Sequence, residues 1–258
     1  MSKLSTHDKF IDLSDYGRPL GTTIAQLFKN TRVTPVHITL LFGVSGLVAA
    51  YCILYHHYFA AGFFIILKSI IDAADGELAR IKKTPSYTGR YLDSLFDLAL
   101  NFIFCLVICL DSTTTWWIAL LAFCALELQG TLYNYYYVIL RTNAEGGDKT
   151  SKIFENEAPV ALPGEKQKTV NLLFKLYTMV YGPFDAIIHF MDNDAFKVKR
   201  FPNWFMTLVS MYGLGFQLLL IAFMLALNLK NFILPFLCYY SIFILMIIGI
   251  RKVVWPAK

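Results

Sequence analysis

The sequence predicts an all-α fold: a polytopic integral membrane bundle of about six transmembrane helices with an N-terminal amphipathic surface helix. The first observation is composition, because 57% of the 258 residues are hydrophobic and only 16% are charged, whereas soluble domains carry roughly 25% charged residues. The second is a series of apolar windows close to the roughly 20 residues that a helix needs to cross a bilayer. These windows are 36–57, 59–80, 89–110, 114–140, 203–228 and 231–250.

The stretch before the first window, residues 15–34, is polar to amphipathic. Its apolar side chains recur at helical spacing, at Leu20, Ile24, Leu27 and Phe28. Pro35 then ends this helix and opens the first span. The pattern predicts a short helix on the cytoplasmic membrane surface, and an irregular polar tail is the alternative.

Two further segments separate the fourth window from the fifth. Residues 142–165 are rich in Gly, Pro and acidic side chains and have no apolar period, which indicates a linker. Residues 168–191 regain apolar character but carry Lys175, Asp185 and His189. We expect the second segment to form a helix that lies against the bundle or on the membrane.

The distribution of basic residues predicts the orientation in the membrane. Of the 23 Lys and Arg residues, Lys230 falls in an outside loop and Lys68 within a span, if the N-terminus lies in the cytoplasm. This is the positive-inside bias, and it places both termini and the active site toward the cytoplasm. The basic residues are spread over several segments with no recognisable nucleic-acid-binding module, so we expect contacts with membrane lipids and no nucleic-acid partner.

The predicted organisation follows from these elements. We expect a cytoplasmic N-terminal segment, a six-helix transmembrane catalytic domain that includes a cytoplasmic segment, and a short tail. In that order, these parts cover residues 1–35, 36–251 (with 142–202 as the cytoplasmic segment) and 252–258.

Four aspartates interrupt the ends of the second and third windows. Asp72 and Asp75 share one helix face at i, i+3, and Asp93 and Asp97 share another at i, i+4. An ionised carboxylate at membrane depth costs several kcal/mol unless it is paired or coordinated. Oxygen ligands suit hard divalent cations, and two ions can clamp a phosphoryl group. The residues therefore predict metal-dependent phosphoryl transfer at the membrane–cytoplasm boundary.

Basic residues flank the four aspartates, at Arg80, Lys82, Lys83 and Arg90. They can neutralise a phosphorylated substrate. The alternative is that they pair with the aspartates in structural salt bridges. A cation transporter is the non-enzymatic alternative, but transporters place acidic residues near the bilayer midplane, often on repeated helices, and the sequence contains no internal repeat.

The acidic stretch resembles the signature of the CDP-alcohol phosphotransferase family, DxxDGxxARx(7–8)GxxxDxxxD. All eight fixed positions are matched, by Asp72, Asp75, Gly76, Ala79, Arg80, Gly89, Asp93 and Asp97. Many family members also carry a Pro-Asn-x-x-Thr box before the first span. Here Pro35 and Thr39 are present, but Val36 stands where Asn is usual, which puts a box role for this segment in doubt.

The resemblance implies an enzyme of phospholipid biosynthesis that moves a phosphoryl-linked group from a CDP-alcohol to the hydroxyl of a second alcohol and releases CMP. It implies that Asp72, Asp75 and Asp93 ligate Mg²⁺ or Mn²⁺, as two ions, and that Asp97 completes the cluster or serves as the base. Asp93 and Asp97 are thus the expected catalytic residues. The implied nucleotide-binding residues are Asp72, Gly76, Ala79, Arg80 and Gly89. The resemblance also implies a homodimer.

The two alcohols are less strongly indicated. The DGELAR hexapeptide from residue 75 is more reminiscent of inositol-type members than of the choline and ethanolamine phosphotransferases. We expect CDP-diacylglycerol as donor and a small polar alcohol as acceptor. The alternative is transfer of a choline, ethanolamine or inositol type head group to a lipid or inositol-phosphate acceptor. Possible acceptor or phosphate contacts are Lys68, Arg90, Arg141, Lys149 and Lys152.

Overall fold

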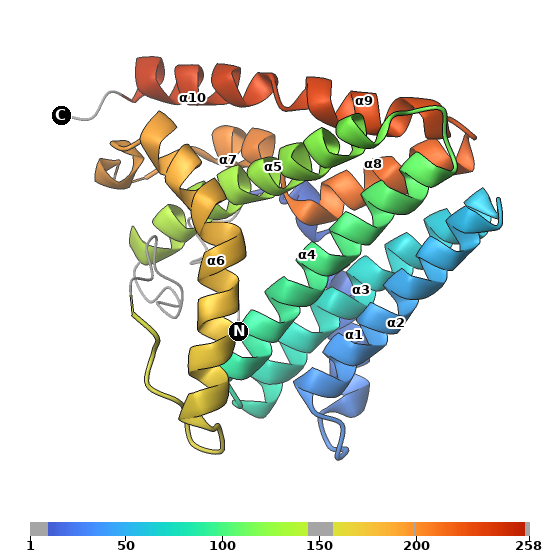
Figure 1. Ribbon diagram of the computed structural model, residues 1–258. Coiled ribbons are helices and arrows are strands. Elements are labelled where there is room, and N and C mark those ends of the chain that lie inside the picture. The colour runs from blue at the N-terminus through green and yellow to red at the C-terminus, as the bar shows by residue number, and fades with distance from the viewer. Residues whose placement is uncertain (1–9, 144–156, 199, 256–258) are drawn as a thin grey trace.

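The computed structural model describes residues 10–143, 157–198 and 200–255, which form α-helices and two short 3-10 helices and contain no strand (Figure 1). The all-α prediction is therefore confirmed for this part of the chain. The α-helices are α1 (Arg18–Phe28), α2 (Pro35–Leu54), α3 (Tyr58–Lys82), α4 (Tyr87–Leu110), α5 (Trp116–Asn143), α6 (Gln167–Met191), α7 (Asn203–Ser210), α8 (Leu214–Ala226), α9 (Lys230–Tyr240) and α10 (Phe243–Val254). The 3-10 helices are η2 (Leu13–Asp15) and η3 (Ala195–Lys197).

Four helical segments are long and apolar enough to cross a membrane: α2, α4, α5 and the α9–α10 stretch. The α7–α8 pair passes the same criteria as one span, bent by 47°. α3 has 25 residues, about 37 Å at 1.5 Å per residue, but it carries the first acidic pair and is not among the apolar segments. The chain is thus a membrane protein by length and composition, with four or five such spans among the described residues, and the predicted count of six is not confirmed.

The predicted amphipathic helix is present as α1, and its apolar stripe is divided. Ile24 and Phe28 pack against the core formed by the neighbouring helices, whereas Leu27 is 72% exposed. α1 approaches α3 closely at Gly21, where an added Cβ would lie 3.0 Å from atoms of Ala73. The prediction of a helix here was therefore correct, although half of its apolar side chains pack against the neighbouring helices.

α6 occupies the segment predicted to lie against the bundle, and it packs on α4 and α5. At its end, buried Asp192 accepts hydrogen bonds from the Tyr136 hydroxyl at 2.6 Å and from Arg251 Nε at 2.8 Å. A buried carboxylate is stable when it is paired and hydrogen-bonded in this way. The network joins α6 to α5 and α10.

α5 contributes to two apolar cores, with its first half to one and its second half to the other. The first joins α1, α2, α3, α4, α8 and α9, and the second joins α6, α7, η3 and α10. In Figure 1, α2, α3 and α4 run in the same diagonal direction, α5 crosses above them, and α6 lies on the other flank, where it packs on α4 and α5. The second half of α3 and the first part of α4 line a common cavity with α5 and α6.

Replacement of Gly62 by alanine is expected to destabilise the bundle by about 1–3 kcal/mol, the usual effect of overpacking. Gly62 is buried where α3 meets α8, and an added Cβ would lie 2.8 Å from the backbone oxygen of Ala222. Thermal unfolding in detergent measures the effect. Gly249→Ala is the matched control, because nothing lies within 4 Å of its added Cβ; an equal loss in both variants would contradict the packing argument.

Candidate active site

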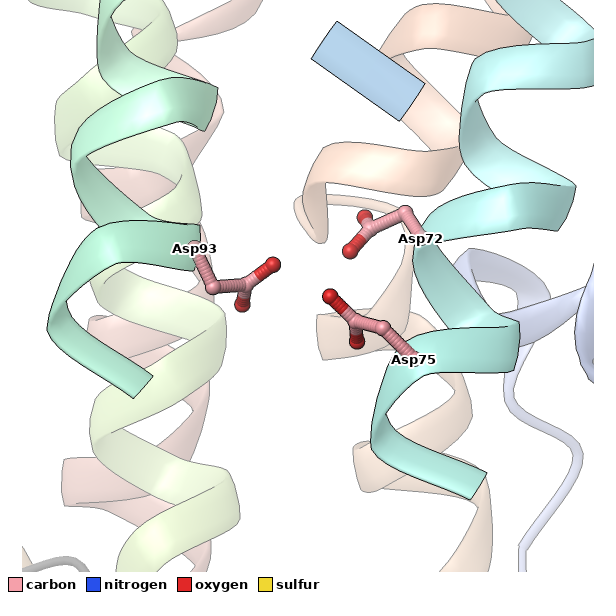
Figure 2. A group of neighbouring side chains, drawn as sticks. All are labelled: Asp72, Asp75 and Asp93. Atoms are coloured by element: carbon pink, nitrogen blue, oxygen red, sulfur yellow. The ribbon is translucent and has the colours of Figure 1, made fainter. Parts of the chain in front are cut away.

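Three of the four aspartates converge between α3 and α4. Asp72 and Asp75 project from α3 toward Asp93 on α4 (Figure 2). One carboxylate oxygen from each lies within 4.8 Å of the other two. Only the connection from Lys83 to Ser86 separates the two helices, so they run antiparallel, and both pack on α2. The spacing within each helix and the short turn together produce the cluster.

The chemistry of this cluster fits a divalent cation. Asp75 accepts a hydrogen bond from the Thr39 hydroxyl at 2.8 Å, while Asp93 Oδ1 is buried and has no hydrogen-bond partner among the described residues. A buried acceptor left unsatisfied costs about 1–3 kcal/mol, and more when it is charged. Oxygen-only ligands match Mg²⁺ or Mn²⁺. Thr39 also shows that the segment after Pro35 reaches the cluster, despite Val36.

Asp97 lies outside this group of three, and it contacts Lys68 instead. The Lys68 ammonium pairs with Asp97 Oδ1 across the helix interface and with Asp72 Oδ2 on its own helix, at 3.4 Å. The Lys68 side chain is 1% exposed, and Nζ lies 4.8 Å from the centre of the Phe42 ring. Lys68 therefore contacts one aspartate of each acidic pair, Asp72 on α3 and Asp97 on α4.

Two of the flanking basic residues have partners other than the four aspartates. Arg80 pairs with Glu77 at 2.8 Å, and Lys82 donates to the backbone oxygens of Thr31 and Val33. The Arg90 guanidinium lies over the Tyr91 ring, 5.2 Å from its centre. Lys68 is a positive partner of the acidic residues, through Asp72 and Asp97.

A cavity of about 410 Å³ opens beside the carboxylates, lined by η2, α1, α3, α4, α5, α6 and α8. Arg80 and Arg90 lie in its wall toward the α3–α4 turn. In the opposite direction along α4, one turn past Asp97, the Asn101 amide donates to the Glu127 carboxylate at 2.8 Å. Gln217 on α8 lines the cavity as well, and its Oε1 is buried with no hydrogen-bond partner in the described structure. The cavity lining therefore contains Arg80 and Arg90 near the α3–α4 turn, and the oxygen atoms of Glu127 and Gln217 farther along α4.

The segment around η2 forms a wall of the cavity that the sequence did not predict. Ser14 Oγ accepts a hydrogen bond from Gly215 N at 3.1 Å, and Leu13 N donates to Ser210 Oγ at 3.0 Å. An added Cβ at Gly215 would lie 1.9 Å from the Ser14 backbone oxygen. Glycine at this position was the available signal, but a single glycine does not identify its partner. Arg18 follows in the same wall, where it pairs with Asp15 at 2.6 Å.

The remaining predicted residues divide between the cavity and other positions. Gly76, Arg80 and Arg90 line the cavity with the four aspartates. Ala79, Gly89, Lys68 and Arg141 are not in its lining. Gly89 has a local role, because its N–H donates to Ser86 Oγ and caps α4 at 2.8 Å. Arg141 is buried, with its Nε unbonded within the described residues. Lys149 and Lys152 lie outside the described residues.

Glu165 ties the loop before α6 to the start of α4. Its carboxylate accepts hydrogen bonds from the Ser86 hydroxyl at 2.8 Å and from Thr88 N–H at 2.7 Å. Burial alone would raise the pKa of Glu165, but these hydrogen bonds outweigh burial and hold that pKa below its usual value. The contact fixes the loop beside the turn that positions the acidic pairs.

Glu165→Gln is expected to lower stability at pH 7 by about 1 kcal/mol or less, since the carboxylate is only partly shielded from solvent. A carboxyl whose pKa is lowered in the folded state stabilises above its unfolded pKa, about 4.3. That stabilisation is lost as the pH falls through the folded value. The difference in melting temperature between wild type and variant should therefore persist from pH 7 down to the unfolded pKa and shrink below it, as the pH falls through the folded value. The exposed Glu157→Gln is the control; a difference that does not depend on pH would contradict this role.

Comparison with known proteins gives one family. The family model described as CDP-alcohol phosphatidyltransferase matches residues 32–250, which include all of the acidic cluster and most of the chain. No curated protein is similar enough to the chain to count as a match.

Proposed function

The chain belongs to the CDP-alcohol phosphatidyltransferase family, and on that premise we propose that it transfers a phosphatidyl group from CDP-diacylglycerol to a small polar alcohol and releases CMP. Membership makes it a transferase of phospholipid biosynthesis, with a CDP-alcohol donor and an alcohol acceptor. The observation that carries the proposal is the convergence of Asp72, Asp75 and Asp93 at the edge of a polar cavity. The finer identities of donor and acceptor are supported by the cavity's chemistry.

The two ends of the cavity support different ligands. Arg80 and Arg90 suit the diphosphate of the donor, because guanidinium groups pair well with phosphate oxygens. Past Asp97, Glu127 and Gln217 offer acceptor oxygens that match the hydroxyl or ammonium hydrogens of a small alcohol. The cations among the described lining residues are Arg18, Arg80 and Arg90, and both Arg18 and Arg80 pair with Glu77. The proposal takes an unphosphorylated alcohol as the acceptor, and an inositol-phosphate acceptor is the alternative.

The acidic group supports a metal-dependent reaction, as is general in this family. Asp72, Asp75 and Asp93 would hold Mg²⁺ or Mn²⁺. When bound, a divalent ion stabilises negative charge on the phosphates and on the departing nucleotide. Binding of two ions stays a prediction.

The chain's own residues supply binding and proton transfer. Gly76 and Arg80 would contact the cytidine diphosphate, with Ala79 and Gly89 shaping the helices around it. Asp97 would accept the proton of the acceptor hydroxyl, for which hydrogen-bond reach is the first requirement. The hydroxyl oxygen forms a bond to the phosphorus that bears diacylglycerol. The bond from that phosphorus to the bridging oxygen breaks, and CMP leaves with the electron pair.

The placement of the site in the cell completes the proposal. We propose that both termini and the acidic cluster face the cytoplasm, from the basic residues of the connecting segments. We also propose that residues 36–251 form one catalytic domain and that the protein acts as a homodimer, the latter from family resemblance alone.

The direct test is CMP release from purified protein in detergent with Mg²⁺ or Mn²⁺. The assay crosses CDP-diacylglycerol, CDP-choline, CDP-ethanolamine and CDP-inositol with serine, glycerol and inositol and with the phosphate esters of the two polyols. We expect release from CDP-diacylglycerol with an unphosphorylated alcohol and none with Asp93→Asn. Release of CMP from a head-group donor only would replace the proposal with the alternative reaction. No CMP release, in a protein that binds neither metal nor CDP, would refute both.

A further inference from the structure

A buried polar network lies in and behind the cavity wall, beyond the acidic cluster. Its members are Asn101 on α4, Glu127 and Gln129 on α5, and Gln217 on α8. Each of these side chains belongs to a residue that is 4% exposed or less. Buried polar groups are costly unless they are hydrogen-bonded. The direction of each hydrogen bond therefore shows which partners the wall still lacks.

The hydrogen bonds of this network fix the orientation of the Gln217 amide. The Gln129 amide lies 2.9 Å from the backbone oxygen of Leu237, which can only accept, so Gln129 turns its NH₂ group toward Leu237. The other end of that amide is then an oxygen, and Gln217 Nε2 donates to it at 2.7 Å. Gln217 Oε1 is thereby left as an acceptor, buried and with no hydrogen-bond partner among the described residues. Because Gln217 lines the cavity, a ligand there can supply the missing donor.

Glu127 brings a carboxylate to the same part of the cavity. Gln217 Nε2 lies 3.5 Å from the backbone oxygen of Leu126, the residue before Glu127. Glu127 Oε1 accepts a hydrogen bond from the neutral Asn101 amide, and no Lys, Arg or His of the described residues is in ion-pair contact with this carboxylate. A deeply buried carboxylate is stable as an ion only when a cation compensates it. The cavity beside Glu127 therefore suits a positively charged group of a ligand.

We infer that Glu127 and Gln217 are specificity-determining residues that select an acceptor alcohol carrying an ammonium group. This inference rests on the proposed function and deepens it by naming the class of acceptor. An ammonium group has three donors and no acceptor, so it can serve both oxygens and balance the charge of Glu127. A second hydroxyl in its place supplies one donor and no charge.

The ammonium group takes no part in the bond changes. The hydroxyl oxygen forms the bond to phosphorus, its proton passes to the proposed base, and CMP leaves with the electron pair of the broken bond. The ammonium nitrogen has no free electron pair, so it does not compete with the hydroxyl. Contact with Glu127 favours this protonated form.

The wild-type protein alone can test the inference. CMP release from CDP-diacylglycerol is measured with two pairs of acceptors, ethanolamine with ethylene glycol and serine with glycerate. Within each pair only an ammonium group is exchanged for a hydroxyl. We expect kcat/KM to be higher for the ammonium member by about 30-fold or more, the usual effect of removing one partner of a buried charge pair.

Two variants assign this preference to the named side chains. Glu127→Gln keeps the oxygen that Asn101 contacts and removes the charge, so it should raise KM for the ammonium acceptor by about 30-fold or more and abolish the preference within each pair. Gln217→Met should raise the same KM by about 2- to 10-fold, as loss of a neutral hydrogen bond does. The donor KM and Mn²⁺ affinity should stay at wild-type values in both. Ser45→Ala is the control, because buried Ser45 bonds the backbone oxygen of Phe64 outside the cavity lining; it should leave the preference unchanged.

The outcomes distinguish this inference from the proposed function. CMP release that is as fast with ethylene glycol and glycerate, or that occurs with phosphorylated polyols only, refutes the selection of an ammonium group and leaves the transferase proposal in place. A preference that survives in folded Glu127→Gln refutes the role of Glu127. No CMP release from CDP-diacylglycerol with any acceptor refutes the proposed function, and the inference falls with it.

Discussion

Replacement of Asp93 by asparagine is expected to lower CMP release by about 1,000-fold or more, corresponding to roughly 4 kcal/mol of lost transition-state stabilisation. Asp93 is the sole ligand from α4 in the group of three, and its buried Oδ1 has no hydrogen-bond partner among the described residues. The amide has the same shape but no negative charge, so α4 would no longer supply a charged ligand to the ion. Mn²⁺ affinity should fall together with activity.

The measurement for Asp93 pairs initial rates of CMP release with Mn²⁺ titration. Asp111→Asn is the control on the same helix, because Asp111 ends α4 beside His56 and Lys230, away from the cavity lining. It should retain activity within a few-fold. Wild-type rates in a folded Asp93→Asn protein would show that the cluster is not the reaction centre.

Asp97→Asn is expected to separate proton transfer from metal binding. Loss of a positioned base lowers the rate by about 100- to 10,000-fold, and the reduction should appear in kcat. Because Asp97 lies outside the group of three, Mn²⁺ affinity should stay close to that of the wild type. The donor KM should change little for the same reason.

Two measurements test this separation. Titration of Asp97→Asn with Mn²⁺ reports the ligand role, and single-turnover CMP release reports the chemical step. A loss of Mn²⁺ affinity as large as in Asp93→Asn would make Asp97 a ligand of equal weight. Such a loss would also remove the reason for assigning to Asp97 the role of proton acceptor.

The acidic cluster was predictable because its determinants are local. The i, i+3 spacing of Asp72 and Asp75 fixes one helix face, and a short turn brings the next helix back beside it. Only the antiparallel course of α3 and α4 was needed to bring Asp93 near them, and the structure places the three carboxylates together. Apolar windows likewise predicted α2, α4 and α5 to within a few residues.

Features that depend on distant contacts were not predictable. Residues 203–228 read as one apolar window, but the chain bends by 47° between α7 and α8. The bend contains Gly213, where an added Cβ would lie 2.2 Å from Ser14 Oγ. A hydropathy profile does not include the contact between two residues that are 199 positions apart in the sequence. The pairing of Lys68 with Asp97 was not predictable for the same reason, because it joins two helices across 29 positions of the sequence.

The wall around η2 has a consequence for how such enzymes diversify. Ser14, Asp15 and Arg18 line the cavity, yet they precede residue 32, where the match to the family model begins. The acidic cluster and this part of the cavity wall thus come from different stretches of the polypeptide. Substitutions in the leading segment can change the shape of the cavity without altering the four aspartates.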